Sequence, residues 1–456
     1  MLGSLAREID LLRTLSIHLE RRSLPSEELT ERFLRREGLG HAFEKGQSFI
    51  AIRTPGHKAF PGLVECLLDR LPKMGRGTNY AAIQDELFGF IEAYIGRDPS
   101  TIGRSDVENL VEHFEKWFSG NVASRRIFIP CVMSQTAAPR FEIGPVVFEF
   151  IDNVTLSDFY PRNIANTALD TSGFDSLLGW MHEGNADWLA RVSVDGCDQK
   201  RAEEIGELAV DLVIVALQLV APNYDTKNMA RLDARRGMSV KRTFTESEGR
   251  HSWGWMNKRP GLPIGPGTLP DILRRASPVF TAVGNVVHSF ASGTFRLPVL
   301  ERAWCDAAYW LHQALAESID TIAITKLETA LEVFLRAEKT SGSQQRMLKI
   351  LSSFFDLAPD DAIGPGSMVS ARQFASNIVR DRSRILHGTW STLNARGIDR
   401  EGMEGFVVQV LRTAVIELEE YSHSKAPIDN IDEYLSWVRQ RKAASRPQTI
   451  KPATGH

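Results

Sequence analysis

The sequence predicts a multidomain α+β protein with a mainly helical N-terminal region, a mixed α/β middle and an all-helical C-terminal bundle. Its 456 residues suffice for two or three domains, because a domain has about 100–200 residues. Hydrophobic residues make up 43% of the chain and charged residues 24%, as in other soluble globular proteins. The spacing of apolar residues also changes twice along the chain, from helical to alternating and back to helical.

The N-terminal region, residues 1–120, is expected to be mostly helical. Within residues 109–118, Leu110, Phe114 and Trp117 recur at intervals of three and four residues. This spacing places the three side chains on one face of a helix, which predicts that the face is buried.

The middle region, residues 121–298, is expected to be mixed α/β and is a candidate sensor or RNA-recognition part. A strongly apolar helix at about 200–221 ends before Pro222. Residues 253–270 contain so many Pro and Gly residues that they predict a long loop. Strands rich in β-branched and aromatic residues are expected at 126–133, 141–151 and 238–244.

The C-terminal third carries a helical pattern in every readable segment, which predicts a helical bundle over residues 299–425. A further helix and a polar tail are expected over 426–456, and the basic stretch from residue 439 is expected to fray because it lacks apolar periodicity. The predicted bundle helices cover residues 301–318, 321–338, 344–355, 369–387 and 404–422.

The charge of the chain excludes a protein that coats nucleic acid over its whole surface. The formal net charge is -3, whereas such proteins are strongly basic. Residues 225–275 differ from this average, with eleven Lys and Arg against five Asp and Glu, a net charge of +6. Phe244, Trp253 and Trp255 lie among these charges, so the segment could grip single-stranded nucleic acid. A solvated basic face is the alternative.

The cysteines and the N-terminus indicate a cytoplasmic protein that does not contact a membrane. The four cysteines form no CxxC pair, which favours core thiols in a reducing compartment over a zinc or redox motif. Charged residues interrupt the first 13 positions, where a signal peptide needs an apolar stretch. The most apolar run, residues 209–221, is too short to cross a membrane.

The clearest chemical pattern ends the fourth predicted bundle helix and contains Arg382 and His387. Arg382 falls inside an apolar stripe of that helix. Burying an arginine there is costly unless it meets an anion or a partner chain. Gly388 can adopt the positive φ that commonly ends a helix, so His387 is expected on the last turn near open space. The stripe consists of Phe374, Ile378 and Ile385.

The spacing of this pair is uninformative without its context. Arg13 with His18, and Arg36 with His41, have the same offset of five residues, and about two accidental matches are expected in a chain of this composition. Neither pair has Ser or Asn after the arginine or Gly after the histidine, whereas the pair in the bundle has Ser383 and Gly388.

The helix geometry predicts how the neighbouring charges are arranged. Residues five apart on an ideal helix differ in direction by about 140°, so Arg382 and His387 need a frayed last turn or a second subunit to come together. Arg380 and Arg384 lie nearer the His387 face, seven and three positions away. They are candidate substrate-binding residues that would form a positive rim for a phosphate chain.

The run from Arg382 through Ser383 to His387 and Gly388 resembles the closing motif of HEPN domains, and especially of their Apea-like branch. The segments 327–335 and 345–351 are also similar to the earlier helices of such domains, so the resemblance covers residues 299–425. It implies an all-helical domain that acts as a homodimer and cleaves RNA without a metal or cofactor, typically as a cytoplasmic antiviral defence or toxin effector.

The resemblance also implies roles for the site residues. His387 would act as the catalytic acid or base on the ribose 2′-hydroxyl or the 5′-oxygen. Arg382 would hold the charge that develops on the phosphorane, and Ser383 would help to orient the pair. Glu332 would be an accessory acid, although an exposed pair of Glu332 with Arg336 is the plainer interpretation.

Other functions remain open at this point. The bundle could be a non-catalytic dimerisation domain, or a module that binds a nucleotide or RNA. A hydrolase centred on His182 and Glu183, or on His251, is a third hypothesis, although their spacing selects no reaction. No HExxH, P-loop or GxGxxG motif is present in the sequence. The RNA target, the trigger and any neutralising partner are not specified by the sequence.

Overall fold

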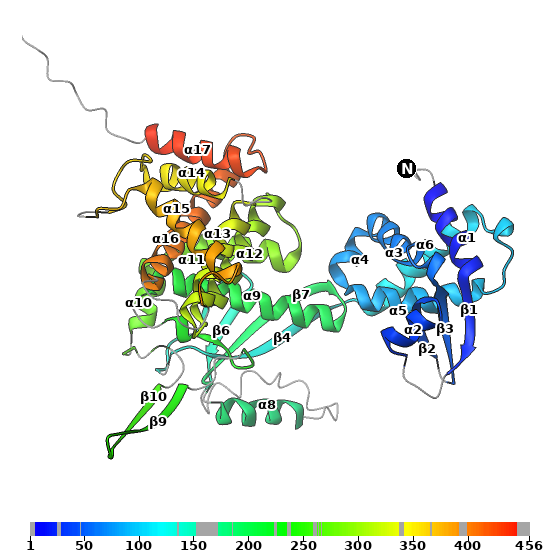
Figure 1. Cartoon of the computed structure of the whole chain (residues 1–456), viewed down its shortest axis with the longest axis horizontal. Helices are drawn as coiled ribbons and strands as arrows, with labels where there is room; N and C mark the ends of the chain where they lie inside the picture. The colour runs from blue at the N-terminus through cyan, green and yellow to red at the C-terminus, as the bar shows by residue number, and fades with distance from the viewer. Residues whose placement is uncertain are drawn as a thin grey trace, which may run out of the picture. The chain divides into compact units, whose positions relative to one another are not determined.

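The computed structural model describes most of the chain and divides it into two compact units. The first unit comprises Met1–Arg125 with Val194–Ile205, and the second comprises Arg126–Ser193 with Gly206–His456. Both combine helices with small sheets (Figure 1), so the chain is α+β as expected. The residues described are 5–24, 29–45, 47–134, 136–151, 172–184, 186–222, 226–234, 239–258, 262, 264–265, 267–336, 342–364, 367–391 and 399–444.

The first unit packs helices on a small antiparallel sheet. The sheet has the order β1-β3-β2, with β1 at Leu19–Ser23, β2 at Leu39–Lys45 and β3 at Ser48–Arg53. The hydrophobic core includes Leu12, Phe60 and Phe114, all fully buried. The helices are α1 Ala6–His18, α2 Glu31–Arg36, α3 Ala59–Arg70, α4 Pro72–Gly77, α5 Tyr80–Ile91 and α6 Arg104–Asn121.

The sheet of the first unit was not expected from the sequence, which predicted a mostly helical region. Strand β1 reads LERRS, and its side chains alternate between more buried and more exposed positions with Leu19 the only fully buried one. A strand with one apolar residue gives no alternating hydrophobic pattern to detect. Strand β3 pairs with β1 on one side and with β2 on the other, so β1 and β2 are the edge strands of this sheet.

The second unit contains a sheet that the described strands build in the order β5-β6-β7-β4-β8. Its strands are β4 Ala123–Val132, β5 Phe141–Ile143, β6 Val146–Phe150, β7 Trp188–Cys197 and β8 Ala230–Arg231. The strand predicted at 126–133 is thus confirmed. The strand predicted at 141–151 is instead two antiparallel strands, β5 and β6, because the chain turns at Gly144, which has a φ of 57°. Helix α8 (Ser172–Glu183) packs against β4 and β7 through Met181, Val132 and Leu189, and α9 (Gln199–Val220) is the apolar helix predicted at about 200–221.

A β-hairpin interrupts the second unit where the sequence predicted a strand followed by a loop. Strand β9 (Ser239–Ser247) confirms the predicted strand, and it pairs along its whole length with β10 (Arg250–Lys258). The predicted loop at 253–270 is therefore wrong over 253–258, because the prolines on which it rested begin only at Pro260. Helix α10 (Thr268–Arg275) likewise occupies the end of that range.

The C-terminal part is a helical bundle, as expected. All five predicted helices are confirmed to within a few residues, and α11 begins the bundle earlier than predicted. Trp304 is fully buried at its centre and donates its indole N–H to the carbonyl of Leu411 at 3.0 Å. The helices are α11 Ser277–Ser292, α12 Pro298–Leu315, α13 Asp320–Phe334, α14 Ser343–Phe355, α15 Ala371–Leu386, α16 Arg400–Ser422 and α17 Ile431–Ala444.

The C-terminal tail differs from the expectation, whereas the cysteines agree with it. The tail was expected to fray from residue 439, but α17 continues to Ala444 because Tyr434, Leu435 and Val438 anchor it in the core; residues 445–456 lie outside the described part. The four cysteines are buried, as predicted. In the part of the chain that the structure describes, no helix is long and apolar enough to cross a membrane.

A buried polar network ties the sheet of the second unit to its bundle. Asp211 on α9 has a side chain that is only 2% exposed, and Arg231 on β8 donates its Nε–H to it at 3.0 Å. On the same helix Gln218 hydrogen-bonds His312 of α12, with 3.1 Å between Oε1 and Nδ1. Because the carboxylate of Asp211 is buried, the stability of the second unit depends on the positive charge of Arg231. A buried carboxylate without its cation is strongly destabilising.

We therefore expect Arg231→Met to destabilise the second unit by about 3–5 kcal/mol. Urea unfolding followed by circular dichroism measures the change. Arg274→Met is the matched control, because Arg274 is 74% exposed and pairs with an exposed Asp271, so its loss costs at most about 1 kcal/mol. Equal midpoints for the two variants would show that the network does not stabilise the fold.

Candidate active site at the end of helix α15

Helix α15 places the candidate residues, and its ends are set by local sequence. Ser370 begins the helix by accepting a hydrogen bond from the backbone N–H of Gln373 at 3.2 Å, a common N-cap. Gly388 has a φ of 69° and ends it, as the sequence predicted. His387 is the C-cap residue, and its backbone N–H bonds the carbonyl of Ser383 at 3.0 Å.

Arg382 is held by carboxylates of helix α13. Its side chain is 21% exposed, and Nη1 donates to Oε1 of Glu332 at 2.8 Å. Its Nε lies 4.0 Å from Oε2 of Glu328 and, among the described residues, has no hydrogen-bond partner. The arginine in the apolar stripe therefore meets an anion, and that anion belongs to its own chain.

Glu328 is the residue of this cluster that sequence reasoning missed. Its side chain is 1% exposed, and neither carboxylate oxygen has a hydrogen-bond partner in the described residues. Burial raises its pKa to about 8, while the nearby positive charge of Arg382 acts to lower it. Glu328 and Glu332 are four residues apart on α13, so they share a helix face, which is the signal that could have found Glu328.

Glu332 takes part in the cluster rather than in the alternative surface pair. Its Oε1 accepts hydrogen bonds from Arg382 and, at 3.3 Å, from the hydroxyl of Ser343. Arg336 lies after the end of α13 with a φ of 50°, and its carbonyl accepts from Arg346. No ion pair between Glu332 and Arg336 occurs within the described residues.

The other predicted residues lie at the exposed end of α15. His387 is exposed, and its ring makes no hydrogen bond within the described part of the chain. Arg380 pairs with its neighbour Asp381 at 3.1 Å. The guanidinium of Arg384 lies over the ring of Trp390, 5.3 Å from its centroid. Arg380 and Arg384 are thus at the surface, where they remain accessible to an anion.

The structure does not join Arg382 to His387 within one chain. The guanidinium is turned to α13, whereas the imidazole is in solvent at the helix end, and no hydrogen bond links the two in the described residues. Ser383 lies between them on the helix, and only its backbone carbonyl makes a contact with His387. Leu386, next to His387, is 56% exposed, which leaves an apolar side chain uncovered beside the site.

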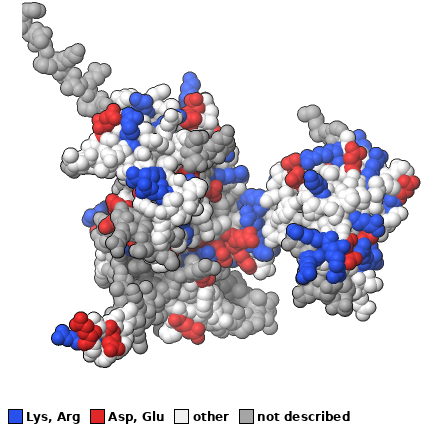
Figure 2. Space-filling view, viewed as in Figure 1, with Lys and Arg blue, Asp and Glu red and all other residues white. Residues whose placement is uncertain are grey.

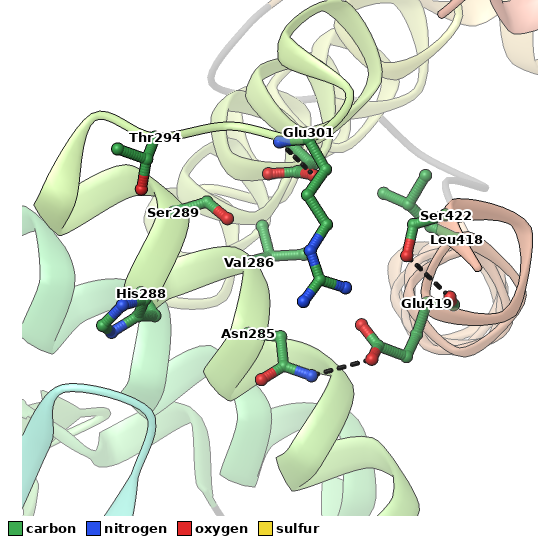
Figure 3. A pocket seen from close by; sticks show the side chains of 10 residues that line it. Asn285, Val286, His288, Ser289, Thr294, Glu301, Leu418, Glu419 and Ser422 are labelled. Carbon is green, nitrogen blue, oxygen red and sulfur yellow. Dashed lines mark hydrogen bonds between the residues drawn. The ribbon is translucent and has the colours of Figure 1, made fainter. Parts of the chain in front are cut away.

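A separate cavity of about 200 Å³ lies between α11, α12 and α16 (Figure 3). His288 and Ser289 lie on one wall, and Glu419 and Ser422 lie on the other. Its buried Glu301 accepts hydrogen bonds from the backbone N–H groups of Arg296 and Leu297 and so caps α12. Burial raises the pKa of Glu301. The cavity contains no predicted site residue.

The remaining candidates do not form a site. His182 and Glu183 are exposed in the last turn of α8, and His251 lies in the β9–β10 hairpin against Phe244. Across the described ranges, no group of three or more His, Cys, Asp or Glu residues is placed to hold a metal ion. Comparison of the chain with models of known protein families found no match, and neither did comparison with curated proteins or with solved structures.

The raised pKa of Glu328 predicts a pH dependence of stability. Glu328 has a pKa of about 8 in the folded chain, against an ordinary value of 4.5. Its contribution to folding is complete below the ordinary value and is lost as the pH rises towards 8, with a slope of at most about 1.4 kcal/mol per pH unit.

Between pH 5 and pH 8 the wild type should lose unfolding free energy as Glu328 ionises. We expect Glu328→Gln to lose less over the same pH range, because glutamine does not ionise. Urea unfolding at several pH values measures this difference. Glu420→Gln, which changes a 61% exposed glutamate, is the control and should follow the wild-type curve. If the unfolding free energies of Glu328→Gln and the wild type change in parallel with pH, the pKa of Glu328 is not raised in the folded chain.

Proposed function

We propose that the chain is a metal-independent endoribonuclease of the HEPN type, whose site is completed by a second copy of the chain. The observation that carries the proposal is the end of α15. There an arginine anchored by Glu332 precedes an exposed histidine on a helix that Gly388 ends. The two residues have the chemistry that cleavage of RNA by its own 2′-hydroxyl requires.

The reaction needs one proton removed and one delivered. The ribose 2′-oxygen forms a bond to phosphorus while the bond from phosphorus to the 5′-oxygen breaks, which yields a 2′,3′-cyclic phosphate and a 5′-hydroxyl. An imidazole side chain can accept the first proton or give the second. We assign this proton transfer to His387, because its ring is exposed and makes no hydrogen bond within the described residues.

Arg382 is suited to hold the charged phosphorane. Its ion pair with Glu332 occupies Nη1, and a guanidinium has five N–H donors, so donors remain for phosphate oxygens. The pair also fixes the direction of the guanidinium before any substrate binds. Arg380 and Arg384 would contact the neighbouring phosphates, because both are exposed near the helix end.

A second copy is needed because one chain leaves the site open. Arg382 and His387 do not meet within the described residues, and Leu386 exposes an apolar side chain beside them. Packing of two α15 ends would cover Leu386 and bring two copies of His387 near two copies of Arg382. This arrangement supports the expected homodimer, with one histidine as the base and the other as the acid.

We expect His387→Ala to lower the rate of RNA cleavage by at least about 100-fold, since general acid–base catalysis contributes about 10²–10⁴. The assay uses the purified full chain and end-labelled RNA in EDTA, and it identifies the 2′,3′-cyclic phosphate product. His423→Ala is the matched control, because His423 is also an exposed bundle histidine. Cleavage by His387→Ala at the wild-type rate would overturn the proposed mechanism.

The second candidate function is a non-catalytic dimerisation or nucleotide-binding domain. It is favoured by the pairing of Arg382 with Glu332, because such a pair can be purely structural. Under this alternative, RNA is bound or ignored but its length does not change in the assay above. A cytoplasmic location, a role in defence and a neutralising partner belong to the first proposal, the endoribonuclease.

We expect the wild type to have about twice the chain mass of 51.0 kDa in light scattering after gel filtration. Leu386→Asp should give the mass of a single chain, because it places a charge in the proposed apolar contact. Ile17→Asp, which changes a 60% exposed side chain of the first unit, should remain dimeric. A monomeric wild type that still cleaves RNA would exclude a composite site.

A further inference from the structure

The β9–β10 hairpin carries aromatic side chains on one face. Residues directly opposite each other on paired strands lie on the same face, as do residues two apart on one strand. Phe244 is opposite Trp253, and His251 is two residues from Trp253. The rings of Phe244 and His251 are stacked, with centroids 5.3 Å apart and an angle of 21° between their planes.

These aromatic side chains are open to solvent. Phe244 is 70% exposed and Trp253 is 74% exposed, although large aromatic residues contribute most to stability when they are buried. In the described part of the chain, β9 and β10 form a sheet only with each other. The folding of the bundle and the five-stranded sheet therefore gives no reason for two exposed aromatic residues at this place.

The opposite face and the turn explain how the hairpin keeps its shape. Thr245 and Ser252 lie on the other face, with their hydroxyl oxygens 2.6 Å apart. Glu248 and Gly249 form the turn with φ values of 50° and 72°, and two consecutive positive φ values match the twist of a tight hairpin. The hairpin therefore presents a polar face and an aromatic face in a defined register.

The charge of the hairpin favours an anionic ligand, although only moderately. Residues 239–258 include four Lys and Arg against two Glu, a net charge of +2. Acidic and basic side chains lie side by side at the tip (Figure 2). Exposed aromatic faces beside a modest positive charge suit the bases of a single-stranded nucleic acid, which stack on aromatic rings and offer phosphates to nearby cations. A duplex keeps its base faces covered.

We propose that Phe244, His251 and Trp253 form a stacking site for unpaired bases, which selects single-stranded RNA for the chain. This inference rests on the proposed ribonuclease function and adds to it the class of substrate. Arg250 precedes His251 on β10 and lies on the opposite, polar face with Ser252, so it would contact a phosphate where the bound strand passes around the tip of the hairpin. Because the net charge is small, most of the affinity comes from stacking, and binding depends less on salt than it does for strongly basic proteins.

The test measures binding separately from cleavage. The full chain carrying His387→Ala is titrated into a fluorescein-labelled 12-nucleotide single-stranded RNA, and fluorescence anisotropy gives Kd. We expect the added double change Phe244→Ala with Trp253→Ala to raise Kd at least about tenfold. Trp253→Phe, which keeps an aromatic face, should stay within about threefold of the parent. The same RNA as a duplex should bind more weakly and should not respond to the double change.

Trp180→Ala is the matched control, since Trp180 is another exposed tryptophan of the same unit, 42% exposed on α8; it should leave Kd unchanged. An unchanged Kd in the double variant, or an equal loss for the duplex, would overturn the inference. A double variant with normal RNA affinity and impaired self-association in light scattering would assign the aromatic face to a protein contact instead, which also overturns it.

The outcomes separate this inference from the proposed function. If His387→Ala cleaves RNA at the wild-type rate while the double variant loses RNA binding, the catalytic proposal fails and the stacking site stands. If His387→Ala is inactive while the double variant binds normally, only the stacking site fails. In an otherwise wild-type chain, the double variant should raise KM for single-stranded RNA and leave kcat unchanged, because the hairpin contacts no reacting atom.

Discussion

The ion pair of Arg382 with Glu332 is the contact on which the candidate site depends. It joins α15 to α13 on the buried face of α15, which otherwise carries Ala375, Ile378 and Ile385. The carboxylate of Glu332 lies 2.8 Å from the partly buried guanidinium and compensates its charge. The hydroxyl of Ser343 bonds the same carboxylate and restricts it further. The guanidinium is thus oriented by the chain itself. In the proposed reaction this would matter because preorganised charges stabilise transition states more effectively than mobile ones.

Glu328 determines the electrostatic character of this pair. When its carboxyl holds a proton, Arg382 and Glu332 together are neutral, and a phosphate meets no net repulsion from them. When Glu328 ionises, the same cluster carries a net charge of -1 and repels a phosphate. Its pKa of about 8 keeps the carboxyl mostly neutral at pH 7, so the cluster of Arg382, Glu332 and Glu328 has no net charge at that pH.

The bundle helices could be predicted from the sequence because their apolar residues recur at a regular spacing. Strands β1 and β10 could not. The bundle helices show a spacing of three and four residues over many turns, and all five predicted ones are present. Strand β1 has too few apolar residues for its period to be detected, and β10 was obscured by the prolines that follow it. Strand β1 is specified by its pairing with β3, which lies elsewhere in the sequence, and β10 by its pairing with the adjacent β9.

Part of the candidate site could also be predicted from the sequence, and part could not. The stripe on α15 predicted that Arg382 needs an anion, and Gly388 predicted the helix end beside His387. Sequence spacing could not choose between a phosphate and a carboxylate of the chain itself, because that depends on which face of α13 packs against α15. Glu328 was missed for this reason, whereas Glu332 was named from a family resemblance and lies in contact with Arg382.

The hairpin has a consequence for the order of folding. Its paired residues are close in sequence, from three positions apart at Ser247 and Arg250 to nineteen at Ser239 and Lys258. Contacts of such short range cost little loop entropy and form within about 1–10 μs, long before a bundle helix can pack against a distant partner. The aromatic face therefore assembles as a local unit, and it can also open as one without disturbing the bundle core.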